Sequence, residues 1–193
     1  TAESVQLLRE AKRNGVEITS SVTIQHLMFT DKDCVGYDPM YRADPPYRSD
    51  GDRKALILGV KDRTIDVVVS DHRPATTEAK ELAFDQSAKG VAGIEATAAL
   101  LMGSCDLELE VVLDALSWRP AKVAGLINHG NLVRPGNVAN LTVLNPKTSW
   151  KFQASEQVSR GRNNPYFEKV LTGRVIHTIC RGELVVTNSE VVI

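Results

Sequence analysis

The sequence has few cysteines, few aromatic residues, almost no net charge and no long apolar run. Among 193 residues there are three cysteines, 5% are aromatic, and 23 lysines and arginines face 24 aspartates and glutamates, a formal net charge of -1. A protein with so little net charge creates no strong positive electrostatic potential that would attract a phosphate backbone. The composition therefore argues against nucleic acid as the main partner. No apolar run approaches the ~20 residues of a membrane-spanning helix, so no membrane partner is expected.

The motifs of common cofactor and nucleophile sites are also missing. Cys34, Cys105 and Cys180 are widely separated, which fits a reducing cytoplasm and neither a disulfide framework nor a cysteine zinc site. There is no HxH, HExxH, CxxC, GxSxG or GxxxxGK[ST]. Gly90–Gly93 (GVAG) is too short for a dinucleotide-binding loop. The basic segment Arg160–Pro165 (RGRNNP) is too small for a nucleic-acid surface, and we interpret it as a solvated loop.

Up to about Asn128, helical and strand patterns alternate. Apolar positions at helical spacing run from Thr1 to a stop at Gly15. A chain that begins on a helix cap looks like a piece of something longer, with a processed N-terminus as the alternative. The remaining patterns predict strands over Val16–Thr23 and Ile65–Val69 and helices over Arg53–Val60, Ile94–Met102, Leu107–Leu116 and Pro120–Leu126. This alternation indicates parallel βα units.

From about Leu132 the pattern changes to antiparallel β sequence. Strands are predicted over Leu141–Leu144, Val175–Cys180 and Glu183–Val186, with a turn at Arg181-Gly182. The fold class is therefore α/β, with residues 1–130 forming part of a β/α barrel and residues 131–193 a small β unit. A complete barrel needs ~250 residues, so this barrel is incomplete.

Asp71 is the best candidate for chemistry because it ends an apolar strand within DVVVSDHRPA (66–75), where barrel enzymes place catalytic groups. A carboxylate there can bind a metal ion and exchange protons with metal-bound water, or it can simply cap the next turn. His72 is expected to point to the other side and to be structural. His26, beside Leu27–Phe29, is expected to be a satisfied core histidine.

Several segments, taken in order, resemble the C-terminal half of a dihydroorotase of the amidohydrolase superfamily. They are TAESVQLLREAKRNGVEIT, QHLMFTD, DPPYRSDGDRKAL, KDRTIDVVVSDHRPA, FDQSAKGVAGIEA, RPAKVAGL, PGNVANLTVLNP and SRGRNNPYFEKVLTGRVIHTICRGELV. The resemblance implies a (β/α)₈ metal-dependent hydrolase (TIM) barrel with a β-sandwich. It also implies zinc-dependent, reversible hydrolysis of the cyclic amide of dihydroorotate in pyrimidine biosynthesis, with one or two zinc ions whose histidine ligands lie upstream of this chain.

The resemblance assigns site residues. Asp71 matches the aspartate that binds the metal and moves the proton. Asp44, Ala75 and Gly90 stand at substrate-binding positions, where Asp44 replaces the usual asparagine and Ala75 a histidine. Ala75 has no side-chain donor, and Asp44 adds a negative charge facing an anionic substrate. These departures resemble degenerate dihydroorotase-like proteins.

Two functions therefore remain open. The chain is part of a dihydroorotase, inactive in isolation, or it is a non-catalytic homologue with a role in assembly. The resemblance leaves a homo-oligomer and aspartate transcarbamoylase as the partners to consider. Upstream histidine ligands would favour the enzyme, and their absence the assembly protein.

Overall fold

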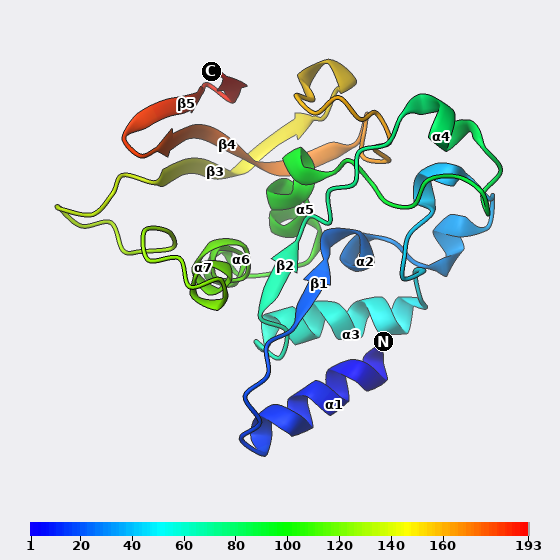
Figure 1. The fold of residues 1–193 in the computed structure, drawn as a ribbon, viewed down its shortest axis with the longest axis horizontal. Coiled ribbons are helices and arrows are strands. Elements are labelled where there is room, and N and C mark those ends of the chain that lie inside the picture. The colour runs from blue at the N-terminus through cyan, green and yellow to red at the C-terminus, as the bar shows by residue number, and fades with distance from the viewer. Residues whose placement is uncertain (193) are drawn as a thin grey trace.

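The computed structural model describes residues 1–192, which form helices around a parallel strand pair and then an antiparallel sheet (Figure 1). The α-helices are α1 (Ala2–Arg13), α2 (Ile24–Met28), α3 (Asp50–Lys61), α4 (Thr77–Glu81), α5 (Thr97–Ser104), α6 (Leu109–Leu113) and α7 (Arg119–Val123). The strands are β1 (Ser21–Thr23), β2 (Val67–Val69), β3 (Leu141–Lys151), β4 (Val170–Cys180), β5 (Glu183–Thr187) and β6 (Glu190–Val191). Short η turns are η1 (Asp31–Cys34), η2 (Pro39–Tyr41), η3 (Ile94–Ala96), η4 (Asp114–Trp118) and η5 (Ala154–Glu156).

Helix α1 begins and ends as its sequence predicts. The Thr1 hydroxyl accepts a hydrogen bond from the amide of Ser4, and basic residues occupy the last turn, where they complement the helix dipole. Gly15 follows the helix with φ of 77°, a left-handed conformation that glycine adopts without strain. The predicted helix is confirmed.

Strands β1 and β2 pair in parallel, with Val22 beside Val68. Both are shorter than predicted, β1 markedly so, because no described strand pairs with residues 16–20. Val16 and Ile18 are accordingly 52% and 39% exposed. A run of β-branched residues becomes a strand only where a neighbour accepts its hydrogen bonds. The carboxyl ends of β1 and β2 lie at the same edge, and this edge positions the candidate site.

The two helices predicted between residues 107 and 126 form one continuous helical stretch, so the predicted break is wrong. Its three parts are α6, the π-helical turn η4 and α7. Pro120 has no amide hydrogen to donate to the preceding turn, and a wider turn next to such a residue accommodates it without ending the helix.

The C-terminal strands form a four-stranded antiparallel sheet in the order β3-β4-β5-β6. The predicted strands are confirmed, although β3 and β4 extend further than expected. Arg181 and Gly182 connect β4 to β5 with φ of 53° and 89°, the backbone that a tight two-residue hairpin turn requires.

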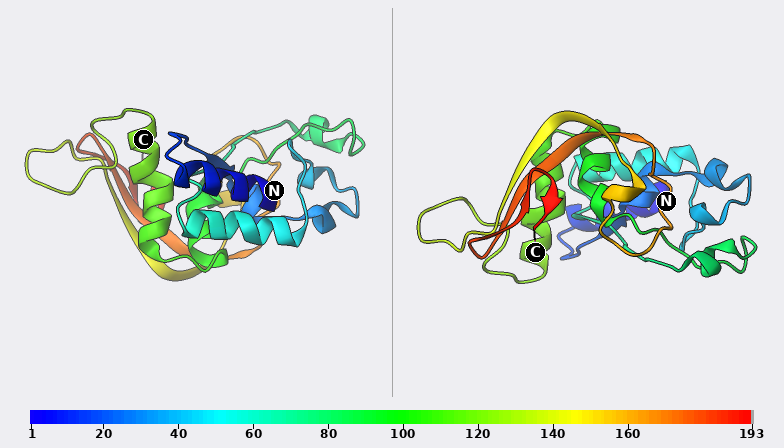
Figure 2. Two further views of the ribbon diagram at one scale, coloured as in Figure 1. Left: turned by 90° about the horizontal axis from the view of Figure 1, so that it is seen from below. Right: turned by 90° about the horizontal axis from the view of Figure 1, so that it is seen from above.

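Helix α5 lies between the parallel pair and the antiparallel sheet, where it packs on β4 (Figure 1). One hydrophobic core joins both parts, since Leu101 of α5, Val60 of α3 and Phe152 after β3 are all buried in it. Figure 2 shows the loop between α7 and β3 projecting from one end, and the segments around η1, η2 and α4 from the other. No helix among the described residues is long and apolar enough to cross a membrane.

A buried ion-pair network fixes the start of β2. The Asp66 carboxylate accepts hydrogen bonds from Lys12 Nζ at 2.7 Å, from Arg119 Nη1 at 2.9 Å and from the Ser20 amide at 2.9 Å. Burial alone would raise the pKa of Asp66, but these hydrogen bonds and positive charges outweigh it, and the net pKa is lowered. One carboxylate thus ties α1, α7 and the approach to β1 together.

Replacing Asp66 with asparagine is expected to lower the free energy of unfolding at neutral pH by about 2 kcal/mol, because two cations lose their buried partner. A carboxylate whose folded pKa is depressed contributes stability above its unfolded pKa and loses it as pH falls through the folded value. The variant should therefore lose less stability than the parent between about pH 6 and about pH 3. Urea unfolding across this range measures both effects. Asp50→Asn, in an exposed pair within α3, is the control and should change little.

Candidate functional site at the carboxyl edge of the parallel strands

Asp71 lies two residues beyond the end of β2, at the edge where the sequence predicts it. Its backbone has φ of 41°, a left-handed conformation that aspartate tolerates better than most residues. Its Oδ1 accepts a hydrogen bond from Arg73 Nε at 2.9 Å, and its side chain is 27% exposed. Asp71 is thus an accessible carboxylate with one oxygen already in an ion pair.

His26 is fully hydrogen bonded, as its sequence context predicts. Its Nδ1 lies 2.6 Å from the Thr23 hydroxyl, and its Nε2 donates to the Pro45 carbonyl at 2.9 Å. Burial lowers its pKa, opposed by the Pro45 carbonyl and by the negative charge of Asp71. With both ring nitrogens hydrogen bonded, His26 is a structural group.

His72 also has a structural setting. Its Nδ1 accepts from the Ile94 amide at 3.4 Å, and its Nε2 lies 3.3 Å from the Ser159 hydroxyl. Its backbone forms a parallel bridge to Val91. His72 therefore joins the strand end to the C-terminal segment and does not share a partner with Asp71.

Two asparagines hold the loop that follows Asp71. Asn163 is 2% exposed; its Nδ2 donates to the carbonyls of Arg73 and Gly90 at 2.9 and 3.0 Å, and its Oδ1 accepts from the Ala75 amide at 2.9 Å. Asn164, 4% exposed, donates to the Ala92 carbonyl at 2.8 Å. The interpretation of RGRNNP as a solvated loop is therefore wrong for Gly161, Asn163 and Asn164, which are buried, and holds only for the exposed Arg160 and Arg162. A primary amide offers donors and an acceptor at once, so it can replace strand pairing in a buried loop.

Ala75 and Gly90, predicted at substrate-binding positions, come together through Asn163. Their amides are already committed, that of Ala75 to Asn163 and that of Gly90 to the Arg42 carbonyl at 2.8 Å. Gly90 has φ of 100°, and a β-carbon there would lie 2.7 Å from the Cβ and Cδ atoms of Arg73. What Gly90 provides is therefore space for the Arg73 side chain.

Asp44, the third predicted substrate-binding residue, is exposed and paired. Its Oδ2 accepts from Lys89 Nζ at 2.7 Å. The hydrogen bond and the positive charge of Lys89 lower the pKa of Asp44. Lys89 thus compensates the negative charge that was expected at this position. The two residues are 45 positions apart, so no local sequence pattern reveals their contact.

The residues described here do not by themselves form a zinc site. Nowhere in residues 1–192 do three histidine, cysteine, aspartate or glutamate side chains gather as metal ligands. Asp71 has one oxygen paired with Arg73, and both histidines nearby use their ring nitrogens elsewhere. A catalytic zinc takes about three protein ligands, so Asp71 is at most one member of such a set.

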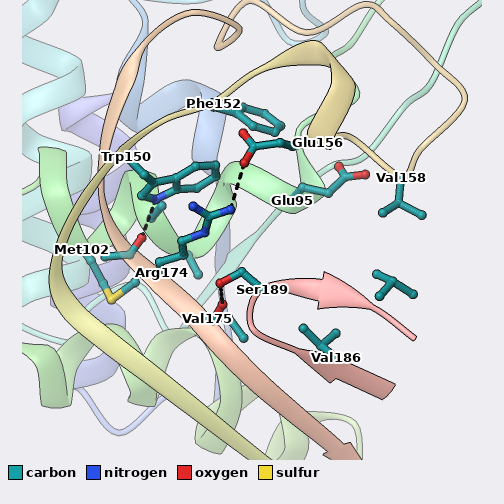
Figure 3. Close-up of a pocket in the computed structure, with 14 residues that line it drawn as sticks. Glu95, Met102, Trp150, Phe152, Glu156, Val158, Arg174, Val175, Val186 and Ser189 are labelled. Atoms are coloured by element: carbon teal, nitrogen blue, oxygen red, sulfur yellow. Dashed lines mark hydrogen bonds and ion pairs between the residues drawn. The ribbon is translucent and has the colours of Figure 1, made fainter. Parts of the chain in front are cut away.

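A hollow of about 220 Å³ lies between α5 and the antiparallel sheet (Figure 3). Arg174 stacks on the Trp150 ring at 4.5 Å and pairs with Glu156 at 2.9 Å. Glu95 reaches this hollow, and its Oε1 accepts from the amide of Ser159, whose hydroxyl contacts His72. The hollow is otherwise largely apolar and does not include Asp71.

The sequence predicts Asp71 as a candidate site residue but does not predict the residues that surround it. Arg73 stands two positions after Asp71, a spacing that places two side chains on one side of an extended strand, but the left-handed backbone at Asp71 means that this pattern alone does not predict their contact. Lys89 and Asn163 reach the site from far along the chain, and no local pattern indicates them.

No protein-family model matches the chain. It is 36% identical over 195 residues to a dihydroorotase of Leifsonia xyli subsp. xyli, and this match covers 99% of the chain and 44% of the relative. A dihydroorotase of Streptomyces coelicolor is 34% identical, with 98% and 45% covered. The chain thus spans less than half the length of these relatives.

Two solved structures superpose closely on all or nearly all of the chain and show its fold. An L-hydantoinase (dihydropyrimidinase) from Arthrobacter aurescens superposes with a TM-score of 0.90 at 25% identity, covering 100% of this chain and 44% of that one. A D-hydantoinase (dihydropyrimidinase) from Thermus sp. gives 0.86 at 26% identity, with 97% and 43% covered. The resemblance expected from the sequence is confirmed: the chain is homologous to the C-terminal portion of dihydroorotases, in the amidohydrolase superfamily.

Proposed function

We propose that this chain is part of a dihydroorotase-type cyclic amidohydrolase and that Asp71 is its acid–base carboxylate. The observation that carries the proposal is the place of Asp71, an accessible carboxylate just beyond the carboxyl edge of the parallel strands, in a chain homologous to dihydroorotases. In this proposal residues 1–130 are part of a (β/α)₈ barrel, and residues 131–193 are a segment of its β-sandwich.

Hydrolysis of a cyclic amide adds water to the ring carbonyl carbon and breaks the bond from that carbon to the ring nitrogen. The Oδ2 of Asp71 makes no hydrogen bond within the described residues, so it is free to accept the proton of the attacking water. The same carboxyl then delivers this proton to the leaving nitrogen.

Zinc dependence, through Asp71 as one metal ligand, stays a prediction, as do dihydroorotate as substrate, pyrimidine biosynthesis as the pathway and the cytoplasm as location. The same holds for assembly with a second copy or with aspartate transcarbamoylase. The non-catalytic alternative is favoured by one observation, the Arg73 guanidinium that already occupies Oδ1 of Asp71.

Turnover measurements separate the two proposals. The longest polypeptide in which this chain occurs is expected to hydrolyse L-dihydroorotate, whereas the 193-residue chain alone is expected to be inactive. Both are assayed against L-dihydroorotate, dihydrouracil and hydantoin, and zinc is measured by elemental analysis. A longer polypeptide that is folded, free of zinc after reconstitution and inactive on all three rings would favour the assembly protein.

A further inference from the structure

Arg73 presents a cation beside Asp71 with most of its donors free. Its Nε donates to Asp71 Oδ1 at 2.9 Å, and its side chain is 49% exposed. Within residues 1–192 its two terminal nitrogens make no hydrogen bond. A guanidinium with both terminal nitrogens free can bind a carboxylate through two parallel hydrogen bonds.

The backbone around Arg73 is fixed, so the side chain has a defined direction. Its amide donates to the Val91 carbonyl at 2.9 Å, and its carbonyl accepts from Asn163 Nδ2 at 2.9 Å. Its aliphatic stem lies over Gly90, where any β-carbon would lie 2.7 Å from it. The open face of Gly90 thus directs the guanidinium toward Asp71.

Neighbouring groups leave Arg73 as the cation best placed for an anionic substituent. Lys89 is paired with Asp44 at 2.7 Å. Arg42 donates to the Ser87 carbonyl. Ala75 has no side-chain donor, and its amide is bonded to Asn163. Arg73 is thus the cation in direct contact with Asp71, with its terminal nitrogens free within residues 1–192.

We propose that Arg73 binds the carboxylate of the substrate and so selects cyclic amides that carry a carboxylate over the same ring without one. This inference rests on the proposed function and names the specificity residue of that site. Before substrate arrives, Arg73 holds the Asp71 side chain through Nε; the substrate carboxylate then takes the terminal nitrogens. Asp71 keeps its second oxygen for the proton.

The test compares two rings that differ only in the carboxylate, L-dihydroorotate and 5,6-dihydrouracil, with binding measured by calorimetry on the longest polypeptide that contains the chain. Arg73→Gln is expected to weaken dihydroorotate binding roughly 10- to 100-fold, the loss of a charge-assisted pair. Dihydrouracil binding should stay within about threefold. Arg73→Lys keeps the charge but loses the two parallel donors of the guanidinium, so its dihydroorotate affinity should lie between those of the parent and Arg73→Gln.

Arg63→Gln is the matched control, since Arg63 is 47% exposed and ion-paired away from the site; it should change neither affinity. If Arg73→Gln leaves both affinities unchanged, or accelerates hydrolysis of both rings equally, the proposal is overturned, and the second result would mean that Arg73 masks Asp71. If the parent hydrolyses no ring but dihydroorotate binding still needs Arg73, the proposed catalytic function fails, and only the binding of the carboxylate by Arg73 is supported.

Discussion

Exchange of Asp71 for asparagine is expected to lower kcat for cyclic-amide hydrolysis by at least about a hundredfold in the longest polypeptide that contains this chain. Asparagine keeps the size of the side chain and an oxygen that can accept from Arg73 Nε. It cannot take a proton from water at neutral pH, however, so the acid–base step loses its group. Stability should change little, because the side chain is partly exposed and Arg73 can turn to water.

Steady-state kinetics on L-dihydroorotate measure this effect, and circular dichroism checks the fold. Glu110→Gln is the matched control, because Glu110 is an exposed carboxylate in an ion pair with Arg63, away from the site. It is expected to leave kcat nearly unchanged. A kcat in Asp71→Asn equal to that of the parent would remove Asp71 from the chemistry.

Replacing Asn163 with alanine is expected to lower the free energy of unfolding by about 3–5 kcal/mol. The change removes three hydrogen bonds and leaves the carbonyls of Arg73 and Gly90 and the amide of Ala75 without that partner. Each buried polar group left unpaired costs roughly 1–3 kcal/mol. The loop from residue 73 to residue 92 should lose its fixed shape.

Equilibrium urea unfolding measures the loss, and limited proteolysis locates it, with new cleavage expected between residues 73 and 92. Asn137→Ala is the control, since Asn137 is exposed and donates to the Leu132 carbonyl at 2.9 Å in a surface turn. It should cost no more than about 0.5 kcal/mol. Equal losses in the two variants would contradict a special role for Asn163.

Features with local causes were predictable from the sequence. The cap at Thr1 and the stop at Gly15 define α1 without reference to the rest of the chain. The turn at Arg181-Gly182 sets the register of β4 against β5 in the same way. Asp71 was predicted because a carboxylate that follows an apolar strand is a local signal.

Features that depend on distant partners were not predictable. Val16 and Ile18 have strand-forming side chains, yet no described strand reaches them. In the sequence, Asn163 looks like a loop residue. Its hydrogen-bond partners, the carbonyls of Arg73 and Gly90, lie 90 and 73 positions earlier in the chain. The carboxylate of the candidate site can therefore be predicted from the strand that precedes it. The residues around that carboxylate cannot, because they come from chain segments that meet only in the folded molecule.

The long sequence separation of the hydrogen bonds made by Asn163 and Asn164 also affects the order in which parts of the protein can fold during translation. β1 and β2 can pair once residue 69 has left the ribosome. The loop that carries Arg73, Ala75 and Gly90 has no buried amide to bind until nearly a hundred further residues have been added. Contacts of such long sequence separation form late and slowly. A nascent chain can therefore pair these strands well before it fixes the loop beside Asp71, which happens only after Asn163 and Asn164 have been added.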